Sequence, residues 1–208
     1  MFITFEGIDF CGKSTQVEML KRFFENHKNK VEIIREPGGT EISEMVRSIL
    51  LDKKHYHMVM ETEIFLFSAA RAQLVREKIR PYLNQGIYVI SDRFHDSTTA
   101  YQGFGRGIDI ESVNRINELA IGTTIPDITF FIDITVEEAN RRKTELHNFD
   151  PDRIEVSDTS FYERVRAGYL YIAERNNRVK VINGMKPIEE IHQDILEEIR
   201  SFEKKEIR

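Results

Sequence analysis

Gly7-Ile8-Asp9-Phe10-Cys11-Gly12-Lys13-Ser14, followed by Thr15, is the stretch that decides the fold. It matches the phosphate-binding loop, in which a glycine, four variable residues and a second glycine precede lysine and then serine or threonine. The glycines let backbone N–H groups surround an oxyanion, the lysine adds a positive charge, and the hydroxyl can ligate Mg²⁺. We therefore predict a nucleoside triphosphate site over residues 7–15, with Lys13 on the phosphates and Ser14 on the metal.

The residues on either side of this loop support the prediction. Residues 2–5, Phe-Ile-Thr-Phe, resemble a short buried strand, whereas residues 16–24 carry Val17, Leu20 and Phe24 at helical spacing. Strand, loop and helix is the order that such a loop requires. The alternative, a chance glycine turn, would not require these two neighbours.

Composition limits the classes of protein to consider. The chain has 208 residues, a net charge of −5 and a single cysteine, so it forms no intrachain disulfide and lacks the excess of basic residues of a general nucleic-acid binder. Glu6 and Asp9 interrupt the N-terminus before a secretory segment could form, and the most apolar run, residues 64–70, is too short to cross a bilayer. We expect a cytoplasmic protein that binds neither nucleic acid nor membrane.

Strand and helix patterns alternate along the chain, which predicts an α/β protein with a five-stranded parallel sheet covered by helices on both faces, the three-layer fold of P-loop nucleotide-binding proteins. We expect a single domain over residues 1–208. Between the elements, polar loops are predicted through Gly103, Gly105 and Gly107 and over residues 144–157, the second being a mobile lid at about 143–158. Strands are predicted at 2–5, 31–34, 87–90, 128–132 and 179–182, and helices at 16–24, 41–51, 62–83, 110–121, 136–143, 162–175 and from 187 onward.

Ligands bind beyond the carboxyl ends of the strands in such sheets, and Arg35, Asp92 and Arg93 follow two of the predicted strands. Two arginines beside a triphosphate loop imply a second anionic group, and a phosphorylated acceptor fits. The alternative is that Arg35 pairs with Glu36, and Arg93 with Asp92, on the surface. Asp92 can hold Mg²⁺ through water opposite Ser14, or it can cap the following turn.

Two further groups of residues point to ligand contacts. Phe67 and Arg71 lie four apart on a predicted helix, so a ring to stack on a base and a guanidinium to bond a base carbonyl would project together. The alternative is a core phenylalanine beside a surface arginine. Arg141, Arg142 and Arg153 flank or occupy the predicted lid, where they would be either a solvated face or cations that close on phosphates.

The chain resembles the thymidylate kinase family along nearly its whole length. The resemblance implies transfer of a phosphoryl group from ATP, with Mg²⁺, to thymidine monophosphate (dTMP), and a homodimer. The stretches that carry it are Phe5-Glu6-Gly7 with the loop, Arg35-Glu36-Pro37-Gly38-Gly39-Thr40, Leu66-Phe67-Ser68-Ala69 with Arg71, Asp92-Arg93-Phe94 with Ser97 and Ala100-Tyr101-Gln102-Gly103, Asp152-Arg153-Ile154-Glu155, and Phe161 with Arg164-Val165-Arg166 and Tyr169-Leu170.

The resemblance also implies roles for single residues. Arg93 would hold the acceptor phosphate, Phe67 would stack on thymine, and Arg71 would bond a thymine carbonyl. Asp9 would contact the sugar 3′-hydroxyl, and Tyr101 would occupy the space that a ribose 2′-hydroxyl needs. Arg35, Ser97 and Gln102 complete the expected substrate-binding set.

The chain departs from the family pattern at two loop positions and at Phe94, where tyrosine is usual. Phe10 stands where one branch of the family has an arginine that reaches the transferring phosphate, so the resemblance points to the branch whose lid carries it. Arg153 is the expected catalytic arginine beside Lys13 and Arg93, and Arg141 or Arg142 is the alternative, both also being expected at the ATP. Cys11 replaces serine or alanine, and its thiol is either a reactive thiolate or packed inward.

Two other functions compete with this interpretation. Another nucleoside monophosphate kinase would use the same machinery on a different base. A nucleotide switch or motor ATPase would act through a partner. The guanine-reading Asn-Lys-any-Asp pattern of a GTP switch does not occur in the sequence, and Arg93 stands after Asp92 where a motor would favour a second acidic residue. Both observations favour the kinase.

Overall fold

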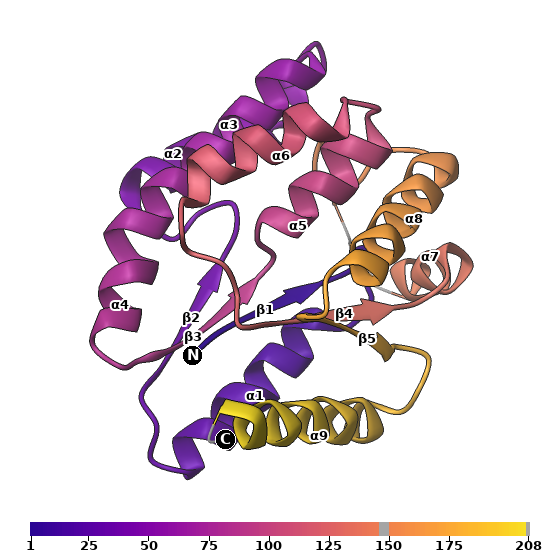
Figure 1. The fold of residues 1–208 in the computed structure, drawn as a ribbon. Coiled ribbons are helices and arrows are strands. Elements are labelled where there is room, and N and C mark those ends of the chain that lie inside the picture. Colours follow the sequence, from indigo (N-terminus) through magenta and orange to yellow (C-terminus); the bar gives the residue numbers. More distant parts are fainter. Residues whose placement is uncertain (146–149, 207–208) are drawn as a thin grey trace.

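The computed structural model describes residues 1–145 and 150–206 and contains five parallel strands in one sheet (Figure 1). Their order across the sheet is β2-β3-β1-β4-β5, so the strand that leads into the phosphate-binding loop is central. The predicted α/β architecture is confirmed. The strands are β1 (Phe2–Glu6), β2 (Val31–Arg35), β3 (Tyr88–Asp92), β4 (Ile128–Asp133) and β5 (Val179–Asn183).

Helices cover both faces of the sheet. On one face lie α1 and α9, which pack against each other, and α8 lies on the other face (Figure 1). A layer of α2, α3 and α6 extends beyond β2 and β3 (Figure 1). The α-helices are α1 (Lys13–Asn26), α2 (Glu41–Leu51), α3 (Met60–Leu74), α4 (Arg80–Asn84), α5 (His95–Thr98), α6 (Ile110–Ile121), α7 (Val136–Thr144), α8 (Thr159–Arg175) and α9 (Ile188–Glu206), with a short 3₁₀ helix at Lys53–His55.

The helix predicted at 62–83 is interrupted by a π-helical segment, Val75–Ile79, between α3 and α4. Pro81 lies in the first turn of α4 and has no N–H to donate to the preceding turn. A wider turn before the proline is a common way for a helix to accommodate the missing bond. Helical periodicity in the sequence does not reveal this change of hydrogen-bond pattern.

The polar loop predicted through Gly103, Gly105 and Gly107 is wrong for the first two glycines, because α5 continues into a π-helix, Thr99–Gly105. Gly107 follows this helix in a loop, with φ +85°. Gly103 and Gly105 serve close packing. A Cβ on Gly105 would lie 2.6 Å from the ring of Phe161, and one on Gly103 would lie 2.7 Å from Ile110. This helical segment therefore lies directly against α8, and it presents its polar side chains to one end of the sheet.

The core forms around β1 and β4. Phe2, Ile3 and Phe5 are at most 1% exposed, as expected for a central parallel strand with helices on both faces. Asp92 pairs with Phe5 on one side and with Arg35 on the other, so β1, β2 and β3 end at the same level. The segments that follow these strands meet at one edge of the sheet. Among the helices that the structure describes, none is both long and apolar enough to cross a membrane.

Candidate active site

A cavity of about 610 Å³ opens at the carboxyl edge of the sheet. Its lining comes from the phosphate-binding loop, the ends of β2 and β3, α2, α3, α5 with the following π-helix, α7, and the segment before α8. The described residues that line it are Asp9, Phe10, Gly12, Lys13, Ser14, Thr15, Arg35, Glu36, Pro37, Arg47, Leu51, Phe67, Arg71, Asp92, Arg93, Ser97, Thr98, Tyr101, Gln102, Arg142, Asp152, Ile154 and Glu155.

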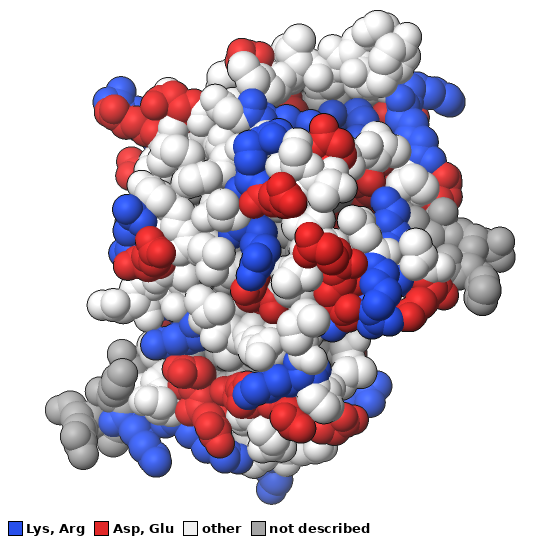
Figure 2. Space-filling view, turned by 90° about the vertical axis from the view of Figure 1, so that its right-hand side faces the viewer, with Lys and Arg blue, Asp and Glu red and all other residues white. Residues whose placement is uncertain are grey.

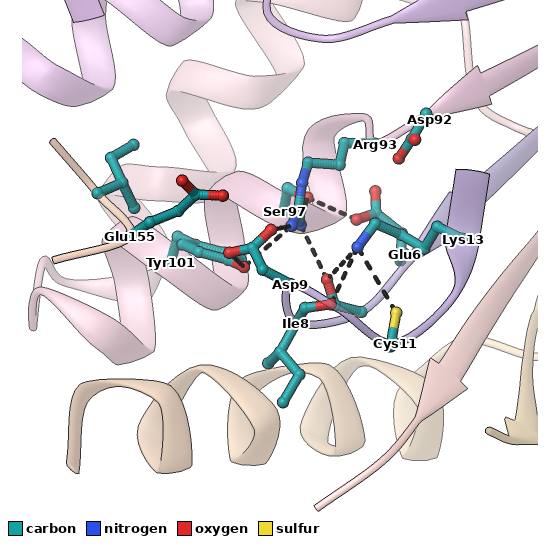
Figure 3. A network of polar contacts seen from close by, with 12 residues as sticks. Glu6, Ile8, Asp9, Cys11, Lys13, Asp92, Arg93, Ser97, Tyr101 and Glu155 are labelled. Atoms are coloured by element: carbon teal, nitrogen blue, oxygen red, sulfur yellow. Dashed lines mark hydrogen bonds and ion pairs between the residues drawn. The ribbon is translucent and has the colours of Figure 1, made fainter. Parts of the chain in front are cut away.

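The phosphate-binding loop connects β1 to α1, and its glycines are required by geometry. Gly7 has φ +142°, and a Cβ there would lie 2.6 Å from the carbonyl oxygen of Ile132. Gly12 has φ +99° and precedes the first turn of α1. The Lys13 ammonium donates to the carbonyl oxygens of Gly7 and Ile8, both at 3.0 Å (Figure 3). The predicted loop thus has the arrangement of a phosphate cradle at a helix N-terminus.

Cys11 is buried in this loop. Its side chain is 1% exposed, and its sulfur lies 3.6 Å from the Lys13 ammonium and beside Gly7 (Figure 3). Of the two alternatives for this thiol, inward packing is the one that the structure supports. The exposed, reactive thiol is wrong, because the loop folds over the sulfur.

The side-chain oxygens of Ser14 and Asp92 lie together at the mouth of the loop. The Ser14 hydroxyl donates to Oδ2 of Asp92 at 2.9 Å, which joins the start of α1 to the end of β3. A hydroxyl and a carboxylate beside a phosphate cradle fit Mg²⁺, which takes one or two protein oxygens and completes its shell with phosphate and water. The two predicted metal ligands are therefore adjacent, as the motif requires.

Arg93 is the centre of the polar network in the cavity (Figure 3). Its backbone is in the left-handed region, with φ +70°, which turns the side chain back over the loop. One Nη pairs with Asp9 and bonds the Tyr101 hydroxyl at 3.1 Å, and the other reaches the Gly7 carbonyl at 2.9 Å and Ser97 at 3.2 Å. The alternative in which Arg93 pairs with Asp92 is wrong.

The charge of Asp9 is fixed by the same network. Burial alone would raise the pKa of this carboxyl, but the Arg93 guanidinium and the Lys13 ammonium lower it below its ordinary value. Asp9 is therefore ionised at neutral pH. It also accepts bonds from the hydroxyls of Tyr101 and Tyr162, at 3.2 and 3.4 Å.

Glu6, which was not among the predicted site residues, accepts hydrogen bonds from residues of the Arg93 network and from the backbone beside it. It is fully buried and accepts bonds from the Phe94 N–H at 2.8 Å, the Ser97 hydroxyl at 2.6 Å and the Tyr169 hydroxyl at 3.0 Å. Burial and the nearby Asp96 carboxylate raise the pKa of Glu6 to about 7. A charged residue at the end of an otherwise apolar strand was the signal in the sequence that could have found it.

Arg71 is buried, so the alternative of a surface arginine is wrong. Its guanidinium is 2% exposed and donates through Nε to Glu36 at 2.6 Å, through Nη1 to Thr98 and Asn117 at 2.7 and 3.3 Å, and through Nη2 to the Phe94 carbonyl at 3.1 Å. Five N–H groups and four bonds to described residues leave one N–H, on Nη2, with no hydrogen-bond partner among these residues.

Phe67 lines the cavity on the same helix as Arg71, whereas Phe65 points outward and is 59% exposed. Tyr101 and Gln102, from the π-helix, lie in the same wall of the cavity. A ring and a guanidinium from α3 and an amide from the π-helix thus line the same cavity as the loop. This is the arrangement that a flat base requires, with a face to stack on and polar groups at its edge.

Two arginines line the cavity in ways that the sequence did not predict: Arg35 has another partner than expected, and Arg47 was not among the predicted residues. Arg35 lies at the wall with its side chain 55% exposed, and it pairs with Glu44 at 3.2 Å, so the alternative of a pair with Glu36 is wrong. Arg47 was missed by the sequence interpretation. It donates to the Pro37 carbonyl at 2.7 Å from α2, and its spacing resembles that of any surface residue of a helix.

The lid-side arginines occupy three different places. Arg142 lines the cavity and donates to the loop carbonyls of Phe10 and Cys11, at 3.3 and 3.4 Å. Arg141 is 56% exposed and pairs with acidic neighbours on α7. Arg153 is outside the lining, with its guanidinium buried against Glu63. Of the predicted lid at 143–158, residues 146–149 lie outside the described residues.

The face of the molecule at the carboxyl edge of the sheet carries no broad basic surface among its described residues in the view of Figure 2. Figure 2 views the molecule from the side toward which the β1 and β4 arrows of Figure 1 point, and basic and acidic side chains are interspersed across this face. Phosphate loop, predicted metal ligands and a second cationic centre, Arg93, share one cavity, which Phe67 and Arg71 also line. Fold and site together define a P-loop phosphotransferase with places for a triphosphate donor and a phosphorylated acceptor.

Comparisons with known proteins narrow this class to one family. The family model for thymidylate kinase matches residues 5–195. A thymidylate kinase of Kosmotoga olearia is 45% identical over 200 residues, covering 95% of this chain and 94% of its own, and one of Chlorobium luteolum is 46% identical over 204 residues, covering 94% and 95%. The crystal structure of thymidylate kinase from Ehrlichia chaffeensis superposes with a TM-score of 0.78 at 37% identity, covering 96% of this chain and 98% of that one. The chain belongs to the thymidylate kinase family.

Proposed function

We propose that this protein transfers the terminal phosphoryl group of magnesium ATP to dTMP, giving dTDP in nucleotide biosynthesis. The observation that carries the proposal is the cavity in which Arg93 contacts the phosphate-binding loop and which Phe67 and Arg71 also line. The loop and Arg93 would each hold the phosphate of one substrate, and Phe67 and Arg71 would hold the base of the acceptor. The enzyme is thus a kinase that acts on a nucleoside monophosphate, and the family supports dTMP as that acceptor.

The proposed chemistry needs no nucleophile from the protein. The acceptor phosphate oxygen attacks the terminal phosphorus of ATP, the bond from that phosphorus to the bridging oxygen of the β-phosphate breaks, and ADP leaves. The protein therefore has to align two phosphates and neutralise their charge. Arg93 holds the acceptor phosphate, and Lys13 with the loop N–H groups holds the donor. Mg²⁺, held at Ser14 and Asp92, would supply further charge neutralisation when bound. We assign the charge that Phe10 cannot provide to Arg142, which contacts the loop.

Base recognition rests on the single N–H that Arg71 retains. That donor suits a carbonyl such as O4 of thymine and opposes the amino group of cytosine. Phe67 offers the ring for stacking. Tyr101 closes the sugar end and bonds both Asp9 and Arg93, so an extra 2′-hydroxyl would have to displace this network.

A coupled assay over a panel of nucleoside monophosphates tests the proposal. With magnesium ATP as donor, we expect dTMP to give the highest kcat/KM, ahead of dUMP, dCMP, dAMP and UMP. Arg93→Met should lose more than 10³-fold in kcat/KM for dTMP, as expected when a charge-assisted contact to the acceptor phosphate is removed. A different preferred acceptor would indicate another nucleoside monophosphate kinase. ATP hydrolysis unaffected by any monophosphate would indicate a switch or motor.

We also propose a homodimer through the outer surface of α2 and α3. Ile42, Met45 and Ile49 on α2 and Phe65 on α3 are between 43% and 59% exposed, and the two helices pack side by side. Exposed apolar side chains that form one contiguous patch mark sites of protein–protein contact. Sedimentation equilibrium should give twice the chain mass of 24.5 kDa, and Phe65→Glu should shift it to the monomer. A monomeric wild type would contradict the proposal.

We propose, finally, that residues 1–208 act as one domain in the cytoplasm. All five strands belong to one sheet, and the cavity takes its lining from residues between Asp9 and Glu155. The segment around 143–158 is proposed to close over the nucleotides as a lid.

A further inference from the structure

Glu63 is a buried carboxylate with three partners from distant parts of the chain. It lies in the first turn of α3 and is 1% exposed. Oε1 accepts from the Gln102 amide at 2.9 Å and from Nε of Arg106 at 3.2 Å, and Oε2 lies 2.7 Å from Nη2 of Arg153. The last contact is outside hydrogen-bond angles, so it is chiefly an electrostatic pair. One carboxylate thus compensates two buried or half-buried arginines.

The first consequence concerns Gln102, which lines the cavity and is itself 2% exposed. The arginines hold the pKa of Glu63 below its ordinary value although burial opposes them, so the carboxylate is ionised and can only accept hydrogen bonds. The NH₂ group of Gln102 must therefore face Glu63, and its carbonyl oxygen must face the other way. Glu63 sets the orientation of an amide in the wall of the cavity.

The second consequence concerns the segment before α8. Arg153 is held by its backbone N–H on the Leu51 carbonyl at 3.1 Å, by Nε on the Leu50 carbonyl at 2.7 Å, and by its pair with Glu63. Its neighbours Asp152, Ile154 and Glu155 line the cavity, and Arg153 does not. Figure 3 shows the Glu155 carboxylate on the side of the cavity where Asp9 and Tyr101 lie. Arg153 thus connects this part of the cavity wall to the end of α2 and to the first turn of α3.

We propose that Glu63 is a positioning residue for the acceptor pocket, which fixes the Gln102 amide and, through Arg153, the cavity wall formed by residues 152–155. Neither Glu63 nor Arg153 touches the cavity itself, so both act through the residues they hold. The proposal rests on the proposed function, because it is the acceptor whose binding the two walls would shape.

Glu63→Gln is the sharpest test, because it keeps the volume and an oxygen for Gln102 but removes the charge that holds Arg153. We expect the KM for dTMP to rise about 10-fold or more, as for a misplaced substrate-binding wall, while the KM for ATP stays within about threefold. An unchanged KM for dTMP in the folded variant, or an equal rise in both KM values, would overturn the proposal.

Arg153 provides a second perturbation from the other side of the pair. Arg153→Met should raise the KM for dTMP as Glu63→Gln does. The effect of the double variant should be smaller than the sum of the two single effects, because the Glu63–Arg153 pair is lost in both single variants. Arg153→Lys, which keeps the charge, should restore most of the affinity. Fully additive effects, or a kcat loss of about 100-fold at unchanged KM in Arg153→Met, would refute the positioning role and favour a catalytic arginine.

Asp133→Asn is the matched control for lost stability. Asp133 pairs with Arg166 through two bonds of 2.6 and 2.8 Å, and neither residue lines the cavity. We expect this variant to lose stability without a change in the KM for dTMP. If it raises that KM as much as Glu63→Gln does, general destabilisation explains the effect and the proposal fails.

Two readouts separate this inference from the proposed function. Hydrogen exchange should become faster at the amide of Arg153 in Glu63→Gln, since the Leu51 bond depends on the Glu63–Arg153 pair, and this measurement needs no substrate. Calorimetric binding of dTMP to the wild type tests the proposed function alone. Unchanged exchange at Arg153 would overturn the positioning role even if dTMP binds, and absent dTMP binding would overturn the function whatever the exchange shows.

Discussion

Replacing Arg142 by methionine tests the assignment of the catalytic charge most directly. Arg142 donates to the loop carbonyls of Phe10 and Cys11 and to the carbonyl of Gly184 at 2.9 Å, and Glu138 holds it through Nε at 2.7 Å. Methionine keeps the apolar stem and removes the charge. The loop, whose glycines and lysine do not depend on this side chain, should remain intact.

The size of the effect follows from the charge and its surroundings. The Arg142 side chain is 27% exposed, so an effective dielectric constant near 20 applies, and a unit charge about 4 Å away then interacts by about 4 kcal/mol. Part of that energy is already present with bound ATP and does not lower the barrier. We therefore expect kcat to fall by about 10² to 10³, with a smaller rise in the KM for ATP and little change in the KM for dTMP.

Arg141→Met is the matched comparison for this experiment. Arg141 is the adjacent residue, carries the same charge and pairs only with Glu138 and Glu145 among its described contacts with acidic residues. Steady-state kinetics with both substrates varied should give a kcat within a few-fold of wild type. Equal losses in the two variants, or a kcat within threefold of wild type in Arg142→Met, would refute the assignment.

Three more outcomes can be measured on the wild type and simple variants. Discrimination of dTMP over dCMP in kcat/KM should reach at least about 10³, because the remaining N–H of Arg71 meets a carbonyl in one base and an amino group in the other, and comparable values would refute this role. Iodoacetamide should label Cys11 in the denatured chain but not in the native enzyme, as mass spectrometry of its peptide would report; rapid native labelling would mean that the loop opens. Burial lowers the pKa of the His95 imidazole to about 4, so the unfolded chain takes up this proton first as pH falls. Between pH 6.5 and 4 the free energy of unfolding should therefore drop by about 1.4 kcal/mol per pH unit through this group, and His95→Gln should flatten the profile measured by urea titration by that amount; parallel profiles would contradict it.

The phosphate-binding loop and the parallel sheet could be predicted because their signals are local. Gly7, Gly12, Lys13 and Ser14 belong to one contiguous stretch, and the geometry that binds phosphate is set by the backbone of that stretch. The apolar strands are equally local, since parallel strands are buried on both faces. The location of Asp92 and Arg93 in the site could be predicted as well, because both residues come at the carboxyl end of a strand, where the ligands of such sheets bind.

The arginines could not be sorted from the sequence, because their roles depend on partners far along the chain. Arg71 is buried since Glu36, 35 residues away, compensates its charge, and no pattern within α3 marks that pairing. Arg142 and Arg153 are equally basic and lie on either side of the same segment. Only the folded chain places one against loop carbonyls and the other against Glu63.

The backbone conformation of the segment after β3 also depends on distant parts of the chain. Its glycines predicted a loop from local conformational freedom, but the π-helix Thr99–Gly105 forms because glycine lets it approach α8. Tyr101 and Gln102 reach the cavity from this helix. The sequence by itself determined the phosphate-binding chemistry and the sheet, since both depend on contiguous residues. Which cations face the ligands, and which are internal anchors, was decided only by tertiary structure, because a buried charge takes its role from the partner that compensates it.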